Sequence, residues 1–264
     1  MNLELTNLHV LVTGGSKGIG LACARGFIAE GARVTLVSRT LETLQAAQRE
    51  LQSLAPGATV NIISADLRDA AEAERMVDAV ERDFGAVDVL VNSAGAAKRT
   101  PAAELTAASW HDAMQAKFFT YIHVINPLIK KMGERGHGAV VNVIGSGGKV
   151  AAVPHLAGGS ANAALMLASA GLAAAYAGKG VRVNAVNPGL TLTERLHEGM
   201  QAEARQQGIS IEEALTRAKA TRPLGRIAEP GEIADAVVYL ASNRASYITG
   251  AVVAMDGAVT PMVV

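Results

Sequence analysis

Short apolar runs alternate with longer, more polar stretches along most of the chain. The runs have the length and composition of buried strands, and the stretches between them have the length of helices. Seven runs predict strands at His9–Val12, Val34–Val37, Val60–Ile63, Val87–Val91, Gly138–Ile144, Val181–Val186 and Ala251–Met255. Because apolar strands separated by helices form parallel sheets that are covered on both faces, we expect an α/β fold with a doubly wound parallel sheet.

The segments between these runs contain good helix formers. They predict helices at about 21–30, 41–54, 70–84, 107–132, 158–178, 193–222 and 230–241. No linker or low-complexity tract divides the chain, so we expect a single domain over residues 1–264. The stretch 190–224 is the longest irregular, polar one, and most of its charged residues are typical of a solvated helix face.

Composition narrows the possible partners and surroundings. Lys plus Arg and Asp plus Glu each number 24, so the net charge is zero and nothing indicates a nucleic acid or an anionic membrane as a partner. A single cysteine, Cys23, and the absence of a visible signal peptide predict a cytoplasmic protein. The apolar, alanine-rich stretch 161–177 is better explained by a soluble helix packed on both sides than by a membrane span. The histidines show no metal-ligand spacing, so we expect no metal site.

A glycine-rich turn, Thr13-Gly14-x-x-x-Gly18-x-Gly20, lies between the first predicted strand and the first helix. Glycines allow the backbone to approach a ligand closely, and a helix N-terminus attracts a phosphate. The spacing is not the G-x-G-x-x-G form of the dinucleotide fingerprint, and a plain glycine-rich turn is the alternative. The position of the turn at the start of a long strand–helix alternation favours a nucleotide phosphate site.

Further motifs follow in an order that resembles one family over essentially the whole chain. They are the glycine-rich turn, Asp66 in Ser64-Ala-Asp-Leu67, Asn92-Ser-Ala-Gly95, Pro188-Gly189 with Thr193, and Tyr247-Ile-Thr-Gly250 followed by Met255-Asp-Gly257. In this combination the chain resembles the short-chain dehydrogenases/reductases. The resemblance implies a Rossmann-type sheet, the cofactor NAD(P)(H), a small-molecule substrate, and a homotetramer or homodimer.

The resemblance also implies which residues contact the cofactor. The glycine-rich turn would hold the phosphates, and Asp66 and Leu67 would contact the adenine. Residues 92–95 would line the floor beneath the adenine, and residues 188–193 would hold the nicotinamide side. The full set is Gly14, Ser16, Lys17, Gly18, Ile19, Gly20, Arg39, Asp66, Leu67, Asn92, Ala94, Gly95, Pro188, Gly189, Thr191 and Thr193. Most of them follow the carboxyl end of a predicted strand, where ligands bind in open α/β sheets.

The second predicted strand indicates which cofactor is preferred. It ends Val37-Ser38-Arg39, without the carboxylate that would accept the ribose 2′-hydroxyl of NAD(H). Lys17 and Arg39 are instead placed to meet a 2′-phosphate, so we expect NADP(H) to be preferred over NAD(H). The alternative is that both are solvated surface cations.

The usual catalytic residues of the family, Asn, Ser, Tyr and Lys, are not in place. Counting seven residues on from Trp110 puts Lys117 at the asparagine position, and reading the fifth strand without a gap puts Gly145 at the serine position. Alignment of Asn162-Ala-Ala-Leu165 with the family's Lys-Ala-Ala-Leu puts Asn162 at the lysine position and Gly158 at the tyrosine position. Lysine and asparagine are thereby exchanged, and we expect the two glycines to leave space for the Lys117 stem or a larger substrate.

A stripe on the predicted helix 107–132 supports a special role for Lys117. Its six members, spaced by four and three residues, are Trp110, Met114, Lys117, Tyr121, Val124 and Leu128. Four of the six are apolar. A lysine on such a face is costly unless it is paired or used, and desolvation would lower its pKa. Tyr121 lies at the i, i+4 spacing that lets side chains meet, so it is a candidate replacement acid, although a packed tyrosine is the commoner case.

We therefore expect Lys117 to act in proton transfer, positioned by Asn162 and assisted by Tyr121 or Ser146. Ser146 fits a substrate contact and a turn cap equally well, and His155 fits a solvated loop histidine better than a pocket residue. The leading hypothesis is an NADP(H)-dependent oxidoreductase that exchanges hydride with a carbonyl or alcohol, with a substrate lid at about 190–224. A catalytically silent NADP-binding protein, acting as a sensor or structural partner, is the alternative. A non-redox enzyme that retains the cofactor is a third.

Overall fold

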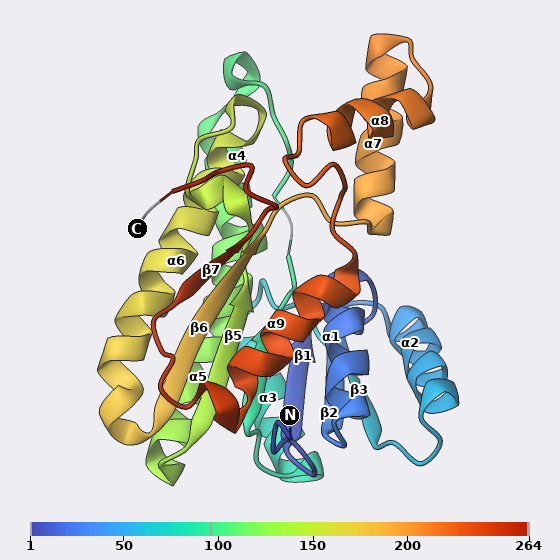
Figure 1. Ribbon diagram of the computed structural model, residues 1–264. Helices are drawn as coiled ribbons and strands as arrows, with labels where there is room; N and C mark the ends of the chain where they lie inside the picture. Colours follow the sequence, from blue (N-terminus) through green and yellow to red (C-terminus); the bar gives the residue numbers. More distant parts are fainter. Residues whose placement is uncertain (1, 96, 263–264) are drawn as a thin grey trace.

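A seven-stranded parallel sheet forms the centre of the computed structural model, which describes residues 2–95 and 97–262 (Figure 1). The strands are β1 (His9–Thr13), β2 (Arg33–Ser38), β3 (Val60–Ser64), β4 (Val89–Asn92), β5 (Gly138–Val143), β6 (Val181–Pro188) and β7 (Val252–Met255). Their order is β3-β2-β1-β4-β5-β6-β7, and each predicted strand is confirmed within two residues of its expected bounds. The order reverses between β1 and β4, which creates a crevice at the carboxyl ends of these strands.

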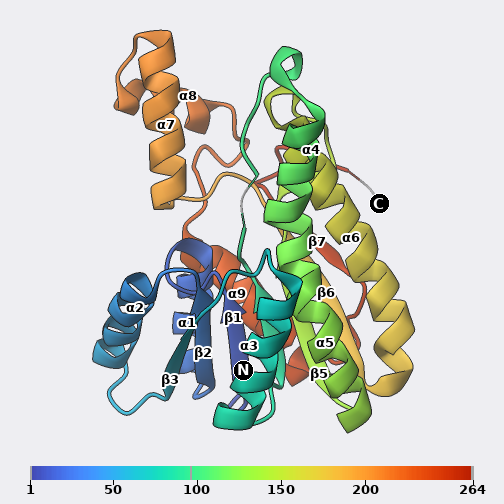
Figure 2. The ribbon, with the colours of Figure 1, turned by 180° about the vertical axis from the view of Figure 1, so that it is seen from behind.

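Three helices cover each face of this sheet. One face carries α1 (Gly18–Ala29), α2 (Leu41–Leu54) and α9 (Pro230–Ala241). The opposite face carries α3 (Ala70–Phe84), α5 (Thr120–Arg135) and α6 (Leu156–Tyr176), as the view from behind shows (Figure 2). Since both faces are buried, strand residues pack alternately into two cores: Val10 and Val12 into one, Leu11 into the other. This two-sided burial explains the continuous apolar runs of the sequence and confirms the predicted doubly wound fold.

The long helix expected at 107–132 is interrupted. It comprises α4 (Ala107–Ala113), a π-helical turn at Met114–Phe119, and α5. A π turn adds a residue to the helical repeat, so it rotates the residues before it away from the face formed by the residues after it. Lys117, Tyr121 and Leu128 are buried as the stripe predicts, whereas Trp110 is 40% exposed, so the predicted stripe was wrong at its N-terminal end.

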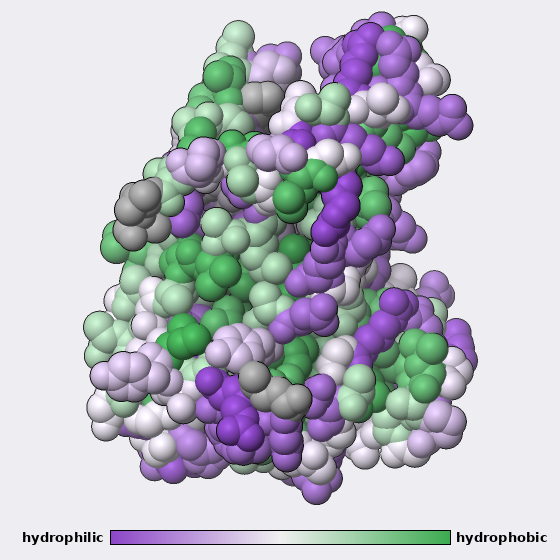
Figure 3. All heavy atoms as spheres, viewed as in Figure 1, coloured by the Kyte–Doolittle hydropathy of each residue, from purple (hydrophilic) through white to green (hydrophobic). Residues whose placement is uncertain are grey.

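The polar segment expected as one helix at 193–222 is two helices. They are α7 (Glu194–Gln207) and α8 (Ile211–Ala220), and the chain turns between them at Gly208, whose φ is +66°. The hairpin has its own small core of Met200, Ala204 and Ala214. It projects from the carboxyl edge of the sheet, and the surface is hollowed between it and the body (Figures 1 and 3).

The segment Leu156–Lys179 is long and apolar enough to cross a membrane by length and composition alone. In the fold it begins at α6, which packs against β6, and Ala161, Leu165 and Ala173 are buried there. Packing of this kind is typical of a core helix on a doubly wound sheet, and it accounts for the buried apolar residues of α6.

Candidate active site

The glycine-rich turn folds tightly against the end of β4. Gly14 has a φ of +67°, and a Cβ there would lie 2.8 Å from the backbone nitrogen of Ala94. A Cβ at Gly20 would lie 2.3 Å from the carbonyl oxygen of Gly14. Gly18 has a φ of +57° and faces the Thr193 side chain, which comes from the far side of the crevice. The turn thus presents bare backbone and the N-terminus of α1, which suits the phosphates of a dinucleotide.

Asn92 supports the crevice from behind instead of facing it. Its side chain is fully buried; Oδ1 accepts a hydrogen bond from the Thr13 hydroxyl at 3.1 Å, and Nδ2 donates to Asn142 Oδ1 at 3.0 Å. Asn142 Nδ2 in turn donates to the Ser169 hydroxyl at 2.9 Å. This buried network joins β1, β4 and β5 to α6, and it fixes the strand ends on which the site is built. Sequence reasoning missed Asn142 and Ser169, although Asn92 and Asn142 occupy paired register positions of adjacent strands.

The expected adenine contacts lie on the segment after β3. Arg68 donates to the Asp66 carboxylate at 2.7 and 3.1 Å, and it holds the pKa of that carboxyl below its usual range. The Leu67 side chain is buried in the core, and its backbone carbonyl oxygen lies 3.0 Å from Nδ1 of His123. Nearby, Lys17 forms an exposed ion pair of 3.1 Å with Glu194 of α7, and Arg39 is exposed. The two predicted 2′-phosphate contacts are therefore accessible.

The remaining expected cofactor residues lie along the crevice between the glycine-rich turn and the end of β6. Gly95 has a φ of +87°, and a Cβ there would lie 2.2 Å from the carbonyl oxygen of Ala116 in the π-helical turn. Thr193 caps α7 by accepting a hydrogen bond from the Leu196 N–H at 3.3 Å. Ser16, Ile19 and Ala94 are half-buried, Thr191 is buried, and Pro188 and Gly189 line the pocket described next.

A pocket of about 400 Å³ opens at the carboxyl ends of β4, β5 and β6. Residues from segments far apart in sequence line it, among them Gly95, Arg99, Lys117, Gly145, Ser146, His155, Asn162, Pro188, Gly189, Arg195 and Arg222. Three of the four expected catalytic residues, Lys117, Asn162 and Ser146, are thus brought together. The fourth, Tyr121, is fully buried behind Lys117 and does not line the pocket.

Lys117 is held by groups other than the one expected. Its Nζ donates to the Tyr121 hydroxyl at 2.7 Å and to the Val143 carbonyl oxygen at 3.1 Å, and the Tyr121 hydroxyl donates to the same carbonyl. Within the described residues no hydrogen bond joins Lys117 to Asn162, so the expected positioning by Asn162 was wrong. Burial, together with the nearby charge of Arg195, lowers the Lys117 pKa to about 7. Burial raises the Tyr121 pKa above its usual range, so Tyr121 positions Lys117 and is not itself suited to donate a proton.

The space expected at Gly158 is filled, whereas Gly145 lines the open pocket. A Cβ at Gly158 would lie 2.2 Å from Cε1 and 2.6 Å from Nε2 of His155, and a Cβ at Gly147 would lie 3.3 Å from Cδ2 of the same ring. The imidazole therefore occupies the room that any side chain at Gly158 would need. At the other glycine, Gly145, the Asn162 amide nitrogen lies 3.3 Å from the Cβ position, and φ is +131°.

The sequence favoured a solvated loop position for His155. In the structure its ring lines the pocket instead. Its Nδ1 is buried and has no hydrogen-bond partner among the described residues. Burial lowers its pKa, and the charges of Arg99, Arg195 and Lys117 lower it further. His155 ends the 3-10 turn Val153–His155 and precedes α6, so no helical spacing in the sequence links it to Gly158.

Residues 14–260 match the family model of the enoyl-(acyl carrier protein) reductases. D-threitol dehydrogenase of Mycolicibacterium smegmatis is 35% identical over 259 residues, which cover 98% of this chain and 95% of that protein. The chain belongs to the short-chain dehydrogenase/reductase family. As a member of this family it shares its fold with dehydrogenases and reductases that act on alcohols and ketones.

Two solved members of the short-chain dehydrogenase/reductase family bear on the site. L-sorbose reductase of Gluconobacter frateurii, in complex with NADPH and L-sorbose, superposes with a TM-score of 0.94 at 29% identity over the whole of both chains. An NADPH-bound short chain oxidoreductase of Pseudomonas aeruginosa PAO1, described as containing an atypical catalytic center, has a TM-score of 0.88 at 31% identity. The match covers 98% of this chain and 100% of that one.

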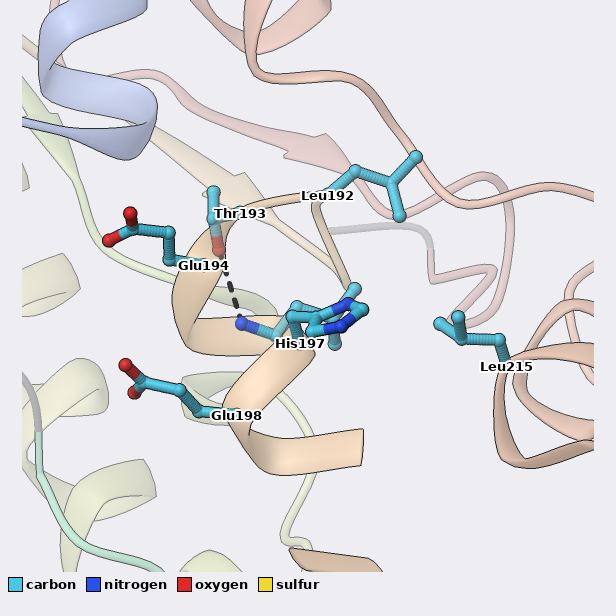
Figure 4. A pocket seen from close by; sticks show the side chains of 7 residues that line it. Leu192, Thr193, Glu194, His197, Glu198 and Leu215 are labelled. Carbon is cyan, nitrogen blue, oxygen red and sulfur yellow. Dashed lines mark hydrogen bonds between the residues drawn. The ribbon is translucent and has the colours of Figure 1, made fainter. Parts of the chain in front are cut away.

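A second, more open hollow of about 660 Å³ lies where α7 leaves the body of this reductase-like fold (Figure 4). Leu192, Thr193, His197 and Leu215 line it, with the Thr193 cap visible as a dashed line. Glu194 also lines it, but none of Lys117, His155 and Asn162 does. The smaller pocket at the strand ends is therefore the candidate site of chemistry.

Proposed function

We propose that the chain is an NADP(H)-dependent oxidoreductase that interconverts a carbonyl and an alcohol without the tyrosine its family generally uses. The observation that carries this proposal is the position of the His155 imidazole. It fills the space beside Gly158, the tyrosine position by alignment, in a pocket that also holds Lys117 and the Pro188–Gly189 end of the crevice. A group able to transfer a proton is therefore present where the usual one is missing.

The bare backbone around Gly14, Gly18 and Gly20 fits a dinucleotide, which when bound would supply or accept the hydride. His155 and Lys117 would exchange the proton of the substrate oxygen. Because burial and neighbouring cations lower its pKa, His155 is neutral at neutral pH and can accept the proton of an alcohol. Lys117, with a pKa of about 7, is divided between its two protonation states at that pH, so it is suited to return a proton to the imidazole or the substrate.

We further propose that NADP(H) is preferred over NAD(H), and Arg39→Ala tests this. Since a 2′-phosphate forms charge-assisted hydrogen bonds that a 2′-hydroxyl does not, the substitution is expected to weaken NADPH binding about tenfold while NADH binding changes little. Fluorescence titration of both cofactors measures the two dissociation constants. Arg49→Ala, which removes an exposed arginine of α2, is the matched control and should affect neither. Equal losses for NADPH and NADH would refute the assignment of Arg39.

The second candidate function is an NADP(H)-binding protein without chemistry. The argument in its favour is that, in the register that the family resemblance implies, all four usual catalytic positions are altered. Against it stands the burial of Lys117 in a pocket wall, an arrangement that costs stability and that a role in the reaction would explain. The two candidates differ in one measurable property, the transfer of hydride to a carbonyl.

A further inference from the structure

The pocket concentrates positive charge in a chain whose net charge is zero. Arg99, Lys117, Arg195 and Arg222 line it, together with His155. Among the described lining residues, Asp256 supplies the one carboxylate. Its Oδ2 accepts a hydrogen bond from the backbone N–H of Thr260 at 3.1 Å, so part of the hydrogen-bonding capacity of this carboxylate is used within its own turn. The pocket is therefore strongly cationic whatever the charge of the rest of the surface.

These cations are not neutralised by ion pairs. Elsewhere arginines meet carboxylates, as Arg135 meets Glu81 at 2.9 Å and Arg217 meets Glu213 at 2.6 Å. In residues 2–95 and 97–262, no carboxylate lies within ion-pair distance of the four pocket cations. Arg195 Nη2 donates instead to the Ala97 carbonyl oxygen at 3.2 Å, and Arg222 Nη1 donates to the Thr221 hydroxyl at 2.7 Å. Both guanidiniums keep donors available for a ligand, since each has five N–H groups.

The pocket cations lie close enough to affect one another. The charges of Arg99, Arg195 and Lys117 all lower the His155 pKa, while burial and Arg99 lower the Arg195 pKa against a smaller opposing effect of Glu198. Like charges held together in a partly enclosed pocket repel, and an anion placed among them would relieve the repulsion. The phosphates of the cofactor are expected at a different place, at the glycine-rich turn beside Lys17 and Arg39. The pocket charge is therefore left for the substrate.

We propose that the substrate is an anionic carbonyl compound, an oxo acid, whose carboxylate binds Arg99 and Arg195 while its carbonyl oxygen faces His155 and Lys117. This inference rests on the proposed function and specifies its substrate class. In the reaction, the C=O bond of the oxo acid is reduced to CH–OH, NADPH is oxidised to NADP⁺, and the proton on oxygen comes from the Lys117 ammonium, directly or through His155, after which Lys117 regains a proton from solvent. The carboxylate itself is unchanged. Bidentate guanidinium–carboxylate bonds would fix the orientation of the ketone.

Calorimetric titration of the NADP⁺ complex tests the inference through binding alone. The probes are pyruvate, acetoacetate and levulinate, each beside its methyl ester, so that every pair shares one ketone and differs in charge. Since charge-assisted bonds are stronger than neutral ones, at least one acid is expected to bind about tenfold or more tightly than its ester. Arg99→Gln and Arg195→Gln should each reduce that preference to within about twofold, because each removes one partner of the carboxylate. NADPH affinity should stay unchanged in both variants.

The control is Arg205→Gln, which removes an exposed arginine of the same helix as Arg195 and should leave the preference intact. If every ester binds as tightly as its acid, or if the arginine variants keep the full preference, the inference is overturned. A loss of NADPH affinity without a loss of acid preference overturns it as well, because the cations would then serve the cofactor. Preference for acids without any NADPH oxidation would instead refute the proposed function and leave the anion site standing.

Discussion

Replacing Lys117 with Met is expected to lower kcat for carbonyl reduction by about 10²- to 10⁴-fold, the range usual for a proton-transfer group. Met has a similar length and no charge, so the pocket wall keeps its shape. The Tyr121 hydroxyl keeps its bond to the Val143 carbonyl, which Lys117 now shares. Steady-state kinetics with NADPH measures the loss, and the dissociation constant of NADPH should change little. Wild-type turnover in this variant would exclude a role for Lys117.

Stability distinguishes a catalytic role of Lys117 from a structural one. Its pKa of about 7 in the fold lies below the usual value of 10.5, so above pH 7 the Lys117 side chain binds more protons in the unfolded chain than in the folded one. Burial raises the pKa values of Cys23 and Tyr121, which act in the opposite direction at higher pH, so the free energy of unfolding should rise between pH 7 and about 9, by about 1 kcal/mol per pH unit, as the buried ammonium becomes neutral. Denaturant titrations across this range should show the slope in the wild type and not in Lys117→Met. The variant should be at least as stable as the wild type at pH 7, and a large destabilisation there would indicate a structural role.

Replacing His155 with Phe is expected to lower kcat/KM by about 10²-fold or more, since it removes a proton-transfer group and keeps a ring of similar size. In the oxidation direction the neutral imidazole is the active form. Its pKa is lowered, so wild-type activity should persist below the usual histidine pKa and fall only as the pH drops further. The residual activity of His155→Phe should not show this decrease at low pH. Rate measurements across the pH range, with oxidation started from NADP⁺ and an alcohol, give both results.

Two further variants separate proton transfer from the simple filling of space. His111→Phe, at an exposed position of α4, is the matched control and should leave kcat/KM unchanged. Gly158→Ala keeps His155 but places a methyl group where the imidazole lies, 2.2 Å from its Cε1, so it should displace the ring and lower activity as well. Full activity in both His155→Phe and Gly158→Ala would contradict the assignment of His155.

Most of the fold could be predicted because burial on both faces leaves a strong trace in the sequence. Each strand is a continuous apolar run, so all seven were found within two residues. The π-helical turn at Met114–Phe119 leaves no such trace, because a change of helical repeat adds no characteristic residue there. The division of the 193–222 segment was visible in principle at Gly208, which ends α7 in the left-handed conformation that glycine favours.

The candidate site could be predicted only where its residues share an element or a motif. The burial of Lys117 and its contact with Tyr121 followed from helical spacing, and the glycine-rich turn followed from its place after β1. The positive pocket could not be foreseen in the same way. Arg99, Arg195 and Arg222 lie on separate loops and helices. They come together only because β4 and β6, which precede these segments, end at the same edge of the sheet. The filling of the Gly158 space by His155 likewise depends on the path of the loop before α6.

Deuterium transfer from NADPH to a ketone tests the central claim most directly. The protein is incubated with NADPH that carries deuterium at both C4 positions of the nicotinamide and with a panel of neutral and anionic ketones, and the alcohols are analysed by mass spectrometry. We predict that at least one alcohol carries the deuterium at its carbinol carbon, and that His155→Phe and Lys117→Met suppress this product. Binding of NADPH without deuterium in any product would contradict the account and favour a binding protein without chemistry.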